Sequence, residues 1–194
     1  LHALDRRQRQ MCIRDSTLAA QVLARAVKNL YPKSKLAIGP TIKDGFYYDV
    51  ECKETISIDD LKKIEKEMDK IVKTKSSITK KLLSKKDALK VFKDKDESYK
   101  EEIINDSDQE DEFQLYYQDD EDFVDLCKGP HLPNLNFIGA YKLTTISGAY
   151  WKGDSSNTML TRIYGTAWRN DKDLNEHLNN IEDCLLYTSP SPRD

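Results

Sequence analysis

The sequence has little of what marks membrane-spanning, secreted or disulfide-stabilised proteins. Its 194 residues include four cysteines, seven glycines and six prolines. No apolar run approaches the roughly 20 residues that cross a bilayer as a helix, so we expect no membrane partner. Four cysteines without the close spacing of small secreted domains indicate a reducing compartment rather than a disulfide framework. We therefore expect a cytoplasmic protein.

An excess of positive charge is also missing. The chain has 31 Lys and Arg against 34 Asp and Glu, a formal net charge of -3, which gives no overall electrostatic argument for binding nucleic acid. Charge is nevertheless segregated, because residues 62–100 are rich in lysine and residues 106–122 are acidic. A local basic face is compatible with this pattern. Hydrophobic residues make up 38% of the chain, which is enough for one main domain around one core.

The two ends of the chain do not resemble its interior. Residues 1–16, LHALDRRQRQMCIRDS, are basic and lack the apolar segment of a secretory signal. Residues 184–194, CLLYTSPSPRD, interrupt a helical pattern with serines and prolines. MCIRDS and LLYTSPSPRD resemble translated sequencing adapters, so we interpret both segments as non-native tails, with ordinary unstructured tails as the alternative. The fold and function are argued from residues 17–183.

The spacing of apolar residues predicts a mixture of helices and strands. Apolar positions recur at helical intervals from Leu18 to Tyr31, and capping boxes at Ser57 and Ser84 predict two further helix starts. Runs rich in β-branched and aromatic residues predict strands. The predicted strands cover residues 35–38, 45–51, 113–118, 123–126, 141–146, 149–152 and 159–164, and further helices cover 87–92, 97–104 and the segment through residues 174–181. We predict an α+β fold, an antiparallel or mixed sheet with packed helices and a charged helical insertion at about 57–105.

The most reactive side chains lie in one segment, Asp125-Leu-Cys-Lys-Gly-Pro-His131. Gly129 and Pro130 disfavour a helix there, so we expect a tight loop after a short strand. Such a loop suits a nucleophile with its base, half of a zinc site, or a site that positions water. Only Cys52 and His177 remain in the interior as further soft ligands, and neither has a partner at motif spacing. The residues alone leave these mechanisms open, together with a purely structural role.

Three sequence blocks together resemble a known family. They are LAIGPTIKDGFYYD at residues 36–49, DLCKGPHLPN at 125–134 and GAYWKGDSSNTMLTRIYGTAW at 148–168. In this order and spacing they resemble the N-terminal editing domain of bacterial-type threonyl-tRNA synthetases, the second additional domain shared with alanyl-tRNA synthetases. The resemblance runs from about residue 18 to residue 183, and ESYK at 97–100 also matches the family.

The resemblance implies a hydrolase that acts on mischarged tRNA. In the family this domain cleaves the ester of serine wrongly attached to threonine tRNA. A second site is needed because one methyl group lets a synthetic site discriminate by only about 1–3 kcal/mol. The implied partners are the 3′ aminoacylated end of tRNA and the remainder of the synthetase, with a homodimer for the full-length enzyme. No cofactor is expected in this domain, since ATP, magnesium and zinc belong to the family's separate catalytic domain.

The resemblance also implies roles for five residues. Asp125 would hold the substrate ammonium, and Tyr48 would supply a hydroxyl to the same pocket. Lys100 would orient a water or the terminal ribose. His131 would position or deprotonate the hydrolytic water, for which its intrinsic pKa suits neutral pH, and Cys127 would shape the pocket rather than attack. The structural alternatives are a strand tyrosine, a solvated helix lysine and a turn carboxylate.

One departure from the family pattern lies at the start of the first predicted helix. The family carries HxxxH there, with both imidazoles pointing into the pocket, whereas this chain has Thr17 and Gln21. Related alanyl editing domains bind zinc through a histidine and cysteine quartet that includes such a pair. Because this chain lacks the pair, we expect no metal here. The chain is expected to hydrolyse its ester slowly or not at all. Two other functions stay open, a noncatalytic tRNA-binding module that uses lysines after Ser57 and a free-standing trans-editing protein.

Overall fold

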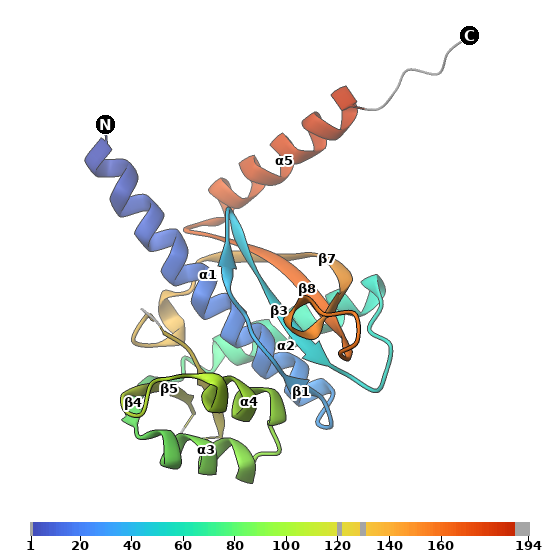
Figure 1. The fold of residues 1–194 in the computed structure, drawn as a ribbon. Helices are drawn as coiled ribbons and strands as arrows, with labels where there is room; N and C mark the ends of the chain where they lie inside the picture. The colour runs from blue at the N-terminus through green and yellow to red at the C-terminus, as the bar shows by residue number, and fades with distance from the viewer. Residues whose placement is uncertain (1, 120–121, 129–130, 189–194) are drawn as a thin grey trace.

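A computed structural model describes residues 2–119, 122–128 and 131–188, and side chains from residue 13 to residue 184 within those ranges. Gly129 and Pro130 of the predicted loop lie outside the described residues. The described chain forms five α-helices and two antiparallel sheets (Figure 1). The predicted α+β class is confirmed. The strands divide between two sheets, where the sequence pattern had suggested one.

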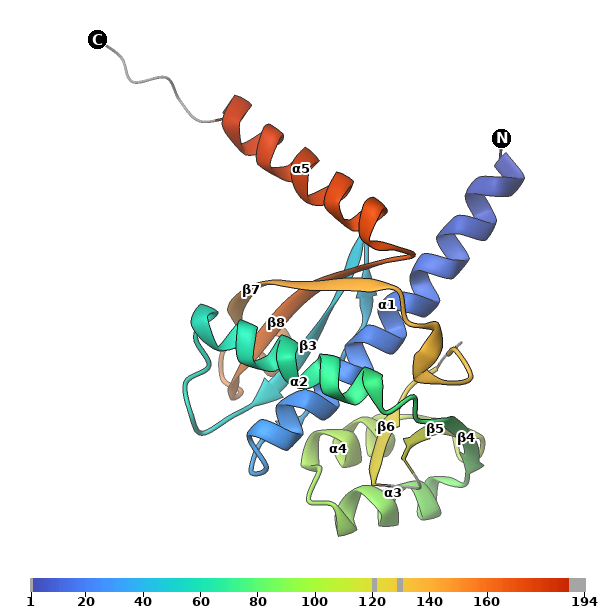
Figure 2. The same ribbon diagram turned by 180° about the vertical axis from the view of Figure 1, so that it is seen from behind.

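The larger sheet has the strand order β1-β3-β8-β7, with β2 paired to β3. Its strands are β1 (Lys35–Leu36), β2 (Thr41–Ile42), β3 (Gly45–Glu51), β7 (Ala140–Tyr150) and β8 (Met159–Trp168). Helices α1 (His2–Leu30) and α2 (Leu61–Lys73) pack against this sheet and against each other, as the view from behind shows (Figure 2). The strand β3, which carries Tyr48, is therefore covered by α1.

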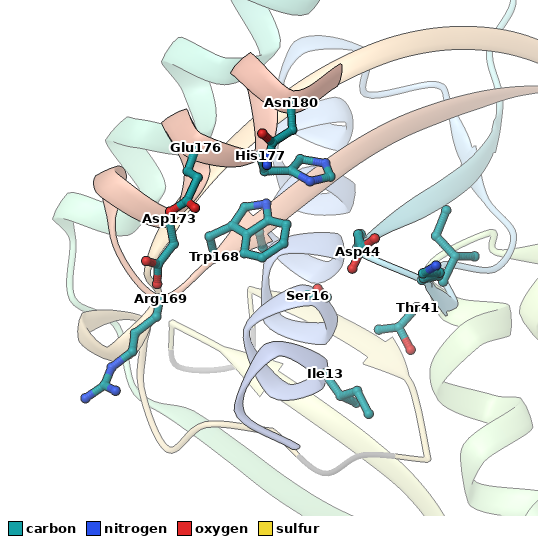
Figure 3. Close-up of a pocket in the computed structure, with 14 residues that line it drawn as sticks. Ile13, Ser16, Thr41, Asp44, Trp168, Arg169, Asp173, Glu176, His177 and Asn180 are labelled. Carbon is teal, nitrogen blue, oxygen red and sulfur yellow. The ribbon is translucent and has the colours of Figure 1, made fainter. Parts of the chain in front are cut away.

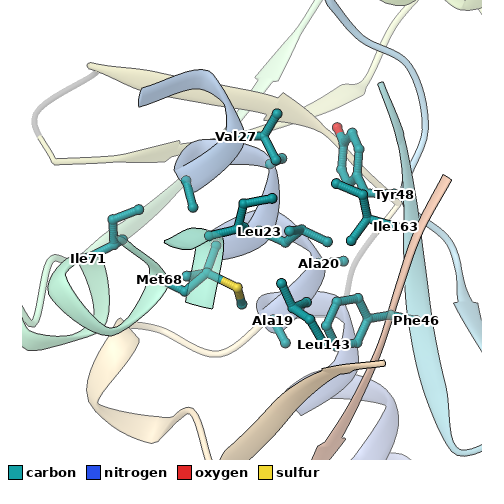
Figure 4. Close-up of a cluster of buried hydrophobic side chains, with 14 of the residues drawn as sticks. Ala19, Ala20, Leu23, Val27, Phe46, Tyr48, Met68, Ile71, Leu143 and Ile163 are labelled. Atoms are coloured by element: carbon teal, nitrogen blue, oxygen red, sulfur yellow. The ribbon is translucent and has the colours of Figure 1, made fainter. Parts of the chain in front are cut away.

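The main core fills the space between α1, α2 and the larger sheet. Small and branched side chains of α1 lie at its centre, between strand residues on one side and α2 residues on the other (Figure 4). The residues labelled there are Ala19, Ala20, Leu23, Val27, Phe46, Tyr48, Met68, Ile71, Leu143 and Ile163, all of them 3% exposed or less. Alanines at the contact let α1 approach the sheet closely, which fixes its polar stripe relative to β3.

The smaller sheet has the order β4-β5-β6 and packs on two short helices. Its strands are β4 (Ile78–Leu83), β5 (Phe113–Gln118) and β6 (Phe123–Leu126), and the helices are α3 (Lys85–Asp94) and α4 (Ser98–Asp106). One face of the sheet joins an apolar cluster with the helices that includes Phe92, Ile104, Leu115 and Val124. Because strand residues alternate between faces, the intervening residues of β5 and β6 point the other way, toward α1.

Helix α4 is attached to both sheets. Its Tyr99 ring packs edge-on against Trp151, next to the end of β7, with ring centroids 4.9 Å apart. The Glu97 carboxylate at its N-terminus accepts hydrogen bonds from the Leu36 N–H at 2.8 Å and from the Lys28 ammonium at 2.6 Å. Further along, Ile104 belongs to the cluster under the smaller sheet. Lys100 therefore projects from a helix that is held on both sides.

The helices at the two ends are longer than predicted. Helix α1 begins at His2 rather than Leu18, and α5 (Asp171–Thr188) continues past residue 184. Both project from the body of the molecule near the chain termini (Figures 1 and 2). Residues 2–16 contain good helix formers and neither glycine nor proline, so the helix continues through them. The non-native origin of both segments stays a prediction.

The sequence pattern missed two strands and divided another into two. Residues 57–105 contain β4 besides three helices, so the insertion is less helical than predicted, and its α2 contributes to the main core. The two-residue strand β2 was also missed. The predicted strand at 149–152 is the end of β7 followed by a short 3-10 turn at Trp151–Gly153. The other predicted strands and helices are confirmed, with small shifts of their ends.

Candidate functional site

A buried ion pair lies where α4, β3 and β6 meet. The Lys100 ammonium contacts Asp125 Oδ1 at 2.6 Å, and the two side chains are only 3% and 4% exposed. The Tyr48 hydroxyl, on a residue 1% exposed, lies 3.1 Å from both oxygens of the same carboxylate. The Lys100 nitrogen also lies 5.4 Å from the centroid of the Tyr48 ring. Three residues far apart in the sequence thus form one contact, and the interpretation of Lys100 as a solvated lysine is wrong.

The two oxygens of Asp125 are used unequally. Oδ1 accepts from the Lys100 ammonium, from the Tyr48 hydroxyl and, at 2.8 Å, from the Leu126 N–H. Among the described residues, Oδ2 accepts only from Tyr48. Burial and the neighbouring Asp125 raise the pKa of Tyr48 well above its ordinary value, so the hydroxyl stays protonated and donates. Oδ2 therefore keeps a lone pair for a cationic ligand.

His131 lies beside this group, on the polar face of the smaller sheet. Its ring packs against Tyr116 at an interplanar angle of 59°, with centroids 4.0 Å apart, and its Nε2 lies 3.3 Å from the Gln21 amide nitrogen of α1. Burial lowers the pKa of His131 to about 4, against a smaller opposing effect of Asp125. The imidazole is therefore neutral at neutral pH. A pKa this low makes His131 a weaker base than a free imidazole, and its role toward a hydrolytic water stays a prediction.

Two buried polar atoms at this contact have no hydrogen-bond partner among the described residues, His131 Nδ1 and Gln21 Oε1. Gln21 is 2% exposed, so the amide is held inside the molecule. The orientation of a glutamine amide is assigned from its contacts, and either its N–H or its oxygen can face the ring. In both orientations Nδ1 is the ring nitrogen left to bind a water or a substrate atom.

Cys127 follows β6 and continues its pairing with β5. Its N–H donates to the Gln114 carbonyl at 3.2 Å, so Cys127 lies opposite Gln114, just as Asp125 lies opposite Tyr116. The cysteine is half-buried and forms no disulfide. Burial, and after it the charge of an ionised Cys127, raises the pKa of Tyr116. Asp125 and Cys127 thus stand on one sheet face, turned toward α1.

The polar stripe of α1 forms the opposite wall. Thr17, Gln21 and Arg25 recur every four residues and so share one helix face. Arg25 is 9% exposed and donates at 2.8 Å to the Asp119 carboxylate, at the end of β5. Gln21 contacts His131, as described, whereas the Thr17 hydroxyl donates to the Ile13 carbonyl at 2.6 Å within its own helix. The two positions of the family's histidine pair therefore face the smaller sheet, and Gln21 occupies one of them.

A pocket of about 510 Å³ opens next to His131. It is lined by Ile78, Lys80, Gln114, Tyr116, Lys128, His131, Leu132 and Pro133. The pocket connects the smaller sheet's outer strand β4 with the loop after β6. None of Lys100, Asp125 and Tyr48 lines it, but its Tyr116 lies opposite Asp125 in the sheet.

A larger pocket, of about 830 Å³, lies elsewhere, between α1, the β2–β3 turn, the end of β8 and α5 (Figure 3). Trp168 and His177 form one of its walls, with ring centroids 4.6 Å apart. None of the five site residues named from the sequence lines it. His177 is therefore not a partner of Cys127, and within the described part of the chain no three His, Cys, Asp or Glu side chains are grouped to hold a metal ion.

The structure brings the predicted site residues to one region of the molecule. Tyr48, Lys100 and Asp125 touch directly, and Cys127 and His131 adjoin them on the same sheet face. The sequence reasoning missed Tyr116, which packs against the His131 ring, and Glu97, which anchors α4. Strand pairing was the missing information, since a register of β5 against β6 places Tyr116 opposite Asp125.

Comparison with known families points to a class of domain that is found in aminoacyl-tRNA synthetases. Residues 114–164, which contain β5, β6, Cys127 and His131, match the model of the threonyl and alanyl tRNA synthetase second additional domain. Among the described residues, no helix is long and apolar enough to pass through a membrane.

Within this class, the relatives compared are all threonine–tRNA ligases. The chain is 52% identical over 162 residues to a threonine–tRNA ligase of Borreliella afzelii (strain PKo), a match that covers 82% of this chain and 27% of the ligase. It is 50% identical over 165 residues to the enzyme of Francisella philomiragia, covering 85% and 26%. For Legionella pneumophila the identity is 48% over 172 residues, covering 89% and 26%. The chain belongs to the threonine–tRNA ligase family and spans about a quarter of the length of these relatives.

Proposed function

We propose that this domain edits mischarged tRNA by hydrolysing the ester of serine attached to threonine tRNA. The observation that carries the proposal is the buried Lys100–Asp125–Tyr48 contact beside a neutral imidazole, in a chain related to threonine–tRNA ligases. Perturbed groups gathered next to a pocket are typical of functional sites. The proposed partners are the 3′ end of tRNA and the remainder of a synthetase, which acts in the cytoplasm as a homodimer.

The substrate ammonium would bind at Asp125 Oδ2, the oxygen that has only the Tyr48 hydroxyl as a partner among the described residues. Lys100 would keep the carboxylate ionised and would orient the ester or the ribose. Water would attack the ester carbonyl, and the ribose hydroxyl would leave with a proton. His131 would hold that water through Nδ1. Because its pKa is about 4, it is a weak base at neutral pH, so it would position the water rather than keep a proton taken from it.

The test is deacylation of seryl-tRNA by the chain, compared with a Thr17→His, Gln21→His variant. The expected result is a slow rate for the chain and a rate at least about tenfold higher for the variant, in line with the usual contribution of a positioned acid or base. Asp125→Asn should abolish the variant's activity, and the exposed Asp111→Asn should not. No hydrolysis by either protein would overturn the proposal, whereas equal high rates would show that Thr17 and Gln21 cause no deficit.

A noncatalytic tRNA-binding role for α2 has less support. Lys63 and Lys70 on this helix are paired with Asp60 and Glu67, one turn away. These pairs reduce the charge that the helix offers to phosphate groups. Lys80 and Lys128, which line the pocket beside His131, have no ion-pair partner in the described part of the chain.

A further inference from the structure

The polar face of the smaller sheet forms a continuous row from solvent to the buried ion pair. Lys80 of β4 lies opposite Tyr116 of β5, and Tyr116 lies opposite Asp125 of β6. Residues directly opposite each other in antiparallel strands project from the same face. Lys80 is exposed, Tyr116 is 5% exposed and Asp125 is 3% exposed. A ligand bound at Asp125 would therefore extend toward Lys80.

The pocket along this row is positively charged. Its lining includes Lys80 and Lys128 and contains no carboxylate among the described residues. Neither lysine forms an ion pair with any residue that the structure describes. Asp125 lies close by but is already compensated by Lys100 at 2.6 Å. A positive pocket in a chain with a net charge of -3 is a local feature that attracts an anion.

The separation along the row matches one nucleotide. Neighbouring strands lie about 4.8 Å apart, so β4 is about 10 Å from β6. This is comparable with the separation, within one nucleotide, between an acyl group on the ribose 3′ oxygen and the phosphorus on the 5′ side. A substrate with its amino acid at Asp125 would place its first phosphodiester near β4.

We propose that Lys80 and Lys128 bind the phosphate group on the 5′ side of the terminal nucleoside, with that nucleoside in the pocket beside His131. This inference rests on the proposed editing function, because it assumes an aminoacyl ester at Asp125. It adds a phosphate-binding subsite that recognises the nucleic-acid part of the substrate and acts through affinity rather than through the chemical step. A lysine bound to a phosphate displaces counterions, so its contribution falls with salt.

The experiment measures equilibrium binding of two non-hydrolysable ligands to the 194-residue chain. One is adenosine that carries serine through a 3′ amide, which has no phosphate, and the other is the trinucleotide CCA with the same amide. The proteins compared are the chain, Lys80→Ala, Lys128→Ala and the control Lys86→Ala. Lys86 is exposed on α3, on the opposite side of the smaller sheet, and undergoes the same change of charge.

The chain should bind the trinucleotide more tightly than the nucleoside. Lys80→Ala should weaken trinucleotide binding about 5- to 20-fold and leave nucleoside binding within about twofold, because only the trinucleotide has the phosphate. The slope of log affinity against log salt should fall by about 0.7 for each lysine–phosphate interaction that a variant removes. Lys128→Ala should act in the same direction, and Lys86→Ala should change neither ligand. Circular dichroism checks that each variant is folded.

Three outcomes would overturn the subsite. They are equal binding of both ligands by the chain, equal weakening of both ligands by Lys80→Ala, and a Lys86→Ala effect as large as that of Lys80→Ala. In the first case the nucleoside still binds, so the proposed editing site survives without the phosphate subsite. If neither ligand binds to the chain, both the subsite and the recognition of an aminoacyl nucleoside fail.

Discussion

The buried pair of Lys100 and Asp125 leads to a prediction about stability. The change Lys100→Met keeps an unbranched side chain, one atom shorter, and removes its charge. Asp125 would then keep two partners, the Tyr48 hydroxyl and the Leu126 N–H. Removing one partner of a buried ion pair costs about 3–5 kcal/mol. Because two hydrogen bonds still stabilise the carboxylate, we expect the lower end, about 3 kcal/mol.

The reverse change should cost more. In Asp125→Leu the ammonium would keep only its contact with the Tyr48 ring, at 5.4 Å from the centroid, worth about 0.5–2 kcal/mol. We therefore expect about 5 kcal/mol, the upper end of the range for an orphaned buried charge. The double variant should be destabilised by about 2–3 kcal/mol less than the sum of the two single changes, because neither charge remains unpaired.

The assay is urea unfolding followed by circular dichroism, with linear extrapolation to water. For a chain of this size, about 3 kcal/mol corresponds to a loss of roughly 6–12 °C in Tm. Lys70→Met is the matched control, since its pair with Glu67 spans 3.1 Å but the lysine is 74% exposed, and exposed pairs contribute about 0.2–1 kcal/mol. If Lys100→Met cost no more than this control, the ammonium would not be buried against Asp125 and the geometry of the site would be wrong.

Three further predictions concern the site and its supports. Because the pKa of His131 is about 4 in the fold and about 6.5 unfolded, stability should fall by up to about 3 kcal/mol between pH 6.5 and pH 4, as only the unfolded chain gains the proton; urea titrations of His131→Gln should lack this part of the loss. Gly39→Ala should destabilise by about 1–3 kcal/mol, because its Cβ would lie 2.1 Å from the buried Tyr48 ring; an unchanged Tm would contradict that approach. Arg162→Lys should lose about 1–2 kcal/mol in urea unfolding, since a lysine cannot reproduce the two bonds of 2.8 and 2.9 Å to Asp49; no loss would show that the fork is unnecessary.

Most elements were predictable because local patterns determine them. The capping residue Ser84 accepts from the Asp87 N–H at 3.2 Å, as the pattern predicts for the start of α3. Strand β4 was missed because its residues, ITKKLL, combine lysines with leucines on a half-exposed edge strand, without a clean alternation. Its identity as a strand depends on pairing with β5, a partner that lies much further along the chain, where Leu83 meets Phe113.

The site was predictable in composition and not in its contacts. The resemblance named Tyr48, Lys100 and Asp125, but nothing in the local sequence says that a lysine in a charged helix is 3% exposed. That burial results from the docking of α4 against both sheets. The lowered pKa of His131 also depends on tertiary packing, because burial is its largest cause.

The attachment of α4 to both sheets has a consequence for when the site exists. Tyr48 belongs to the larger sheet and Asp125 to the smaller one, 77 positions apart in sequence, and Lys100 reaches the carboxylate from the helix between them. Contacts between such distant positions close long loops, which costs chain entropy. Partial opening that separates the two sheets would dismantle the site while each sheet kept its own hydrogen bonds. Ligand binding at this site should therefore disappear before the secondary structure does, as denaturant is added.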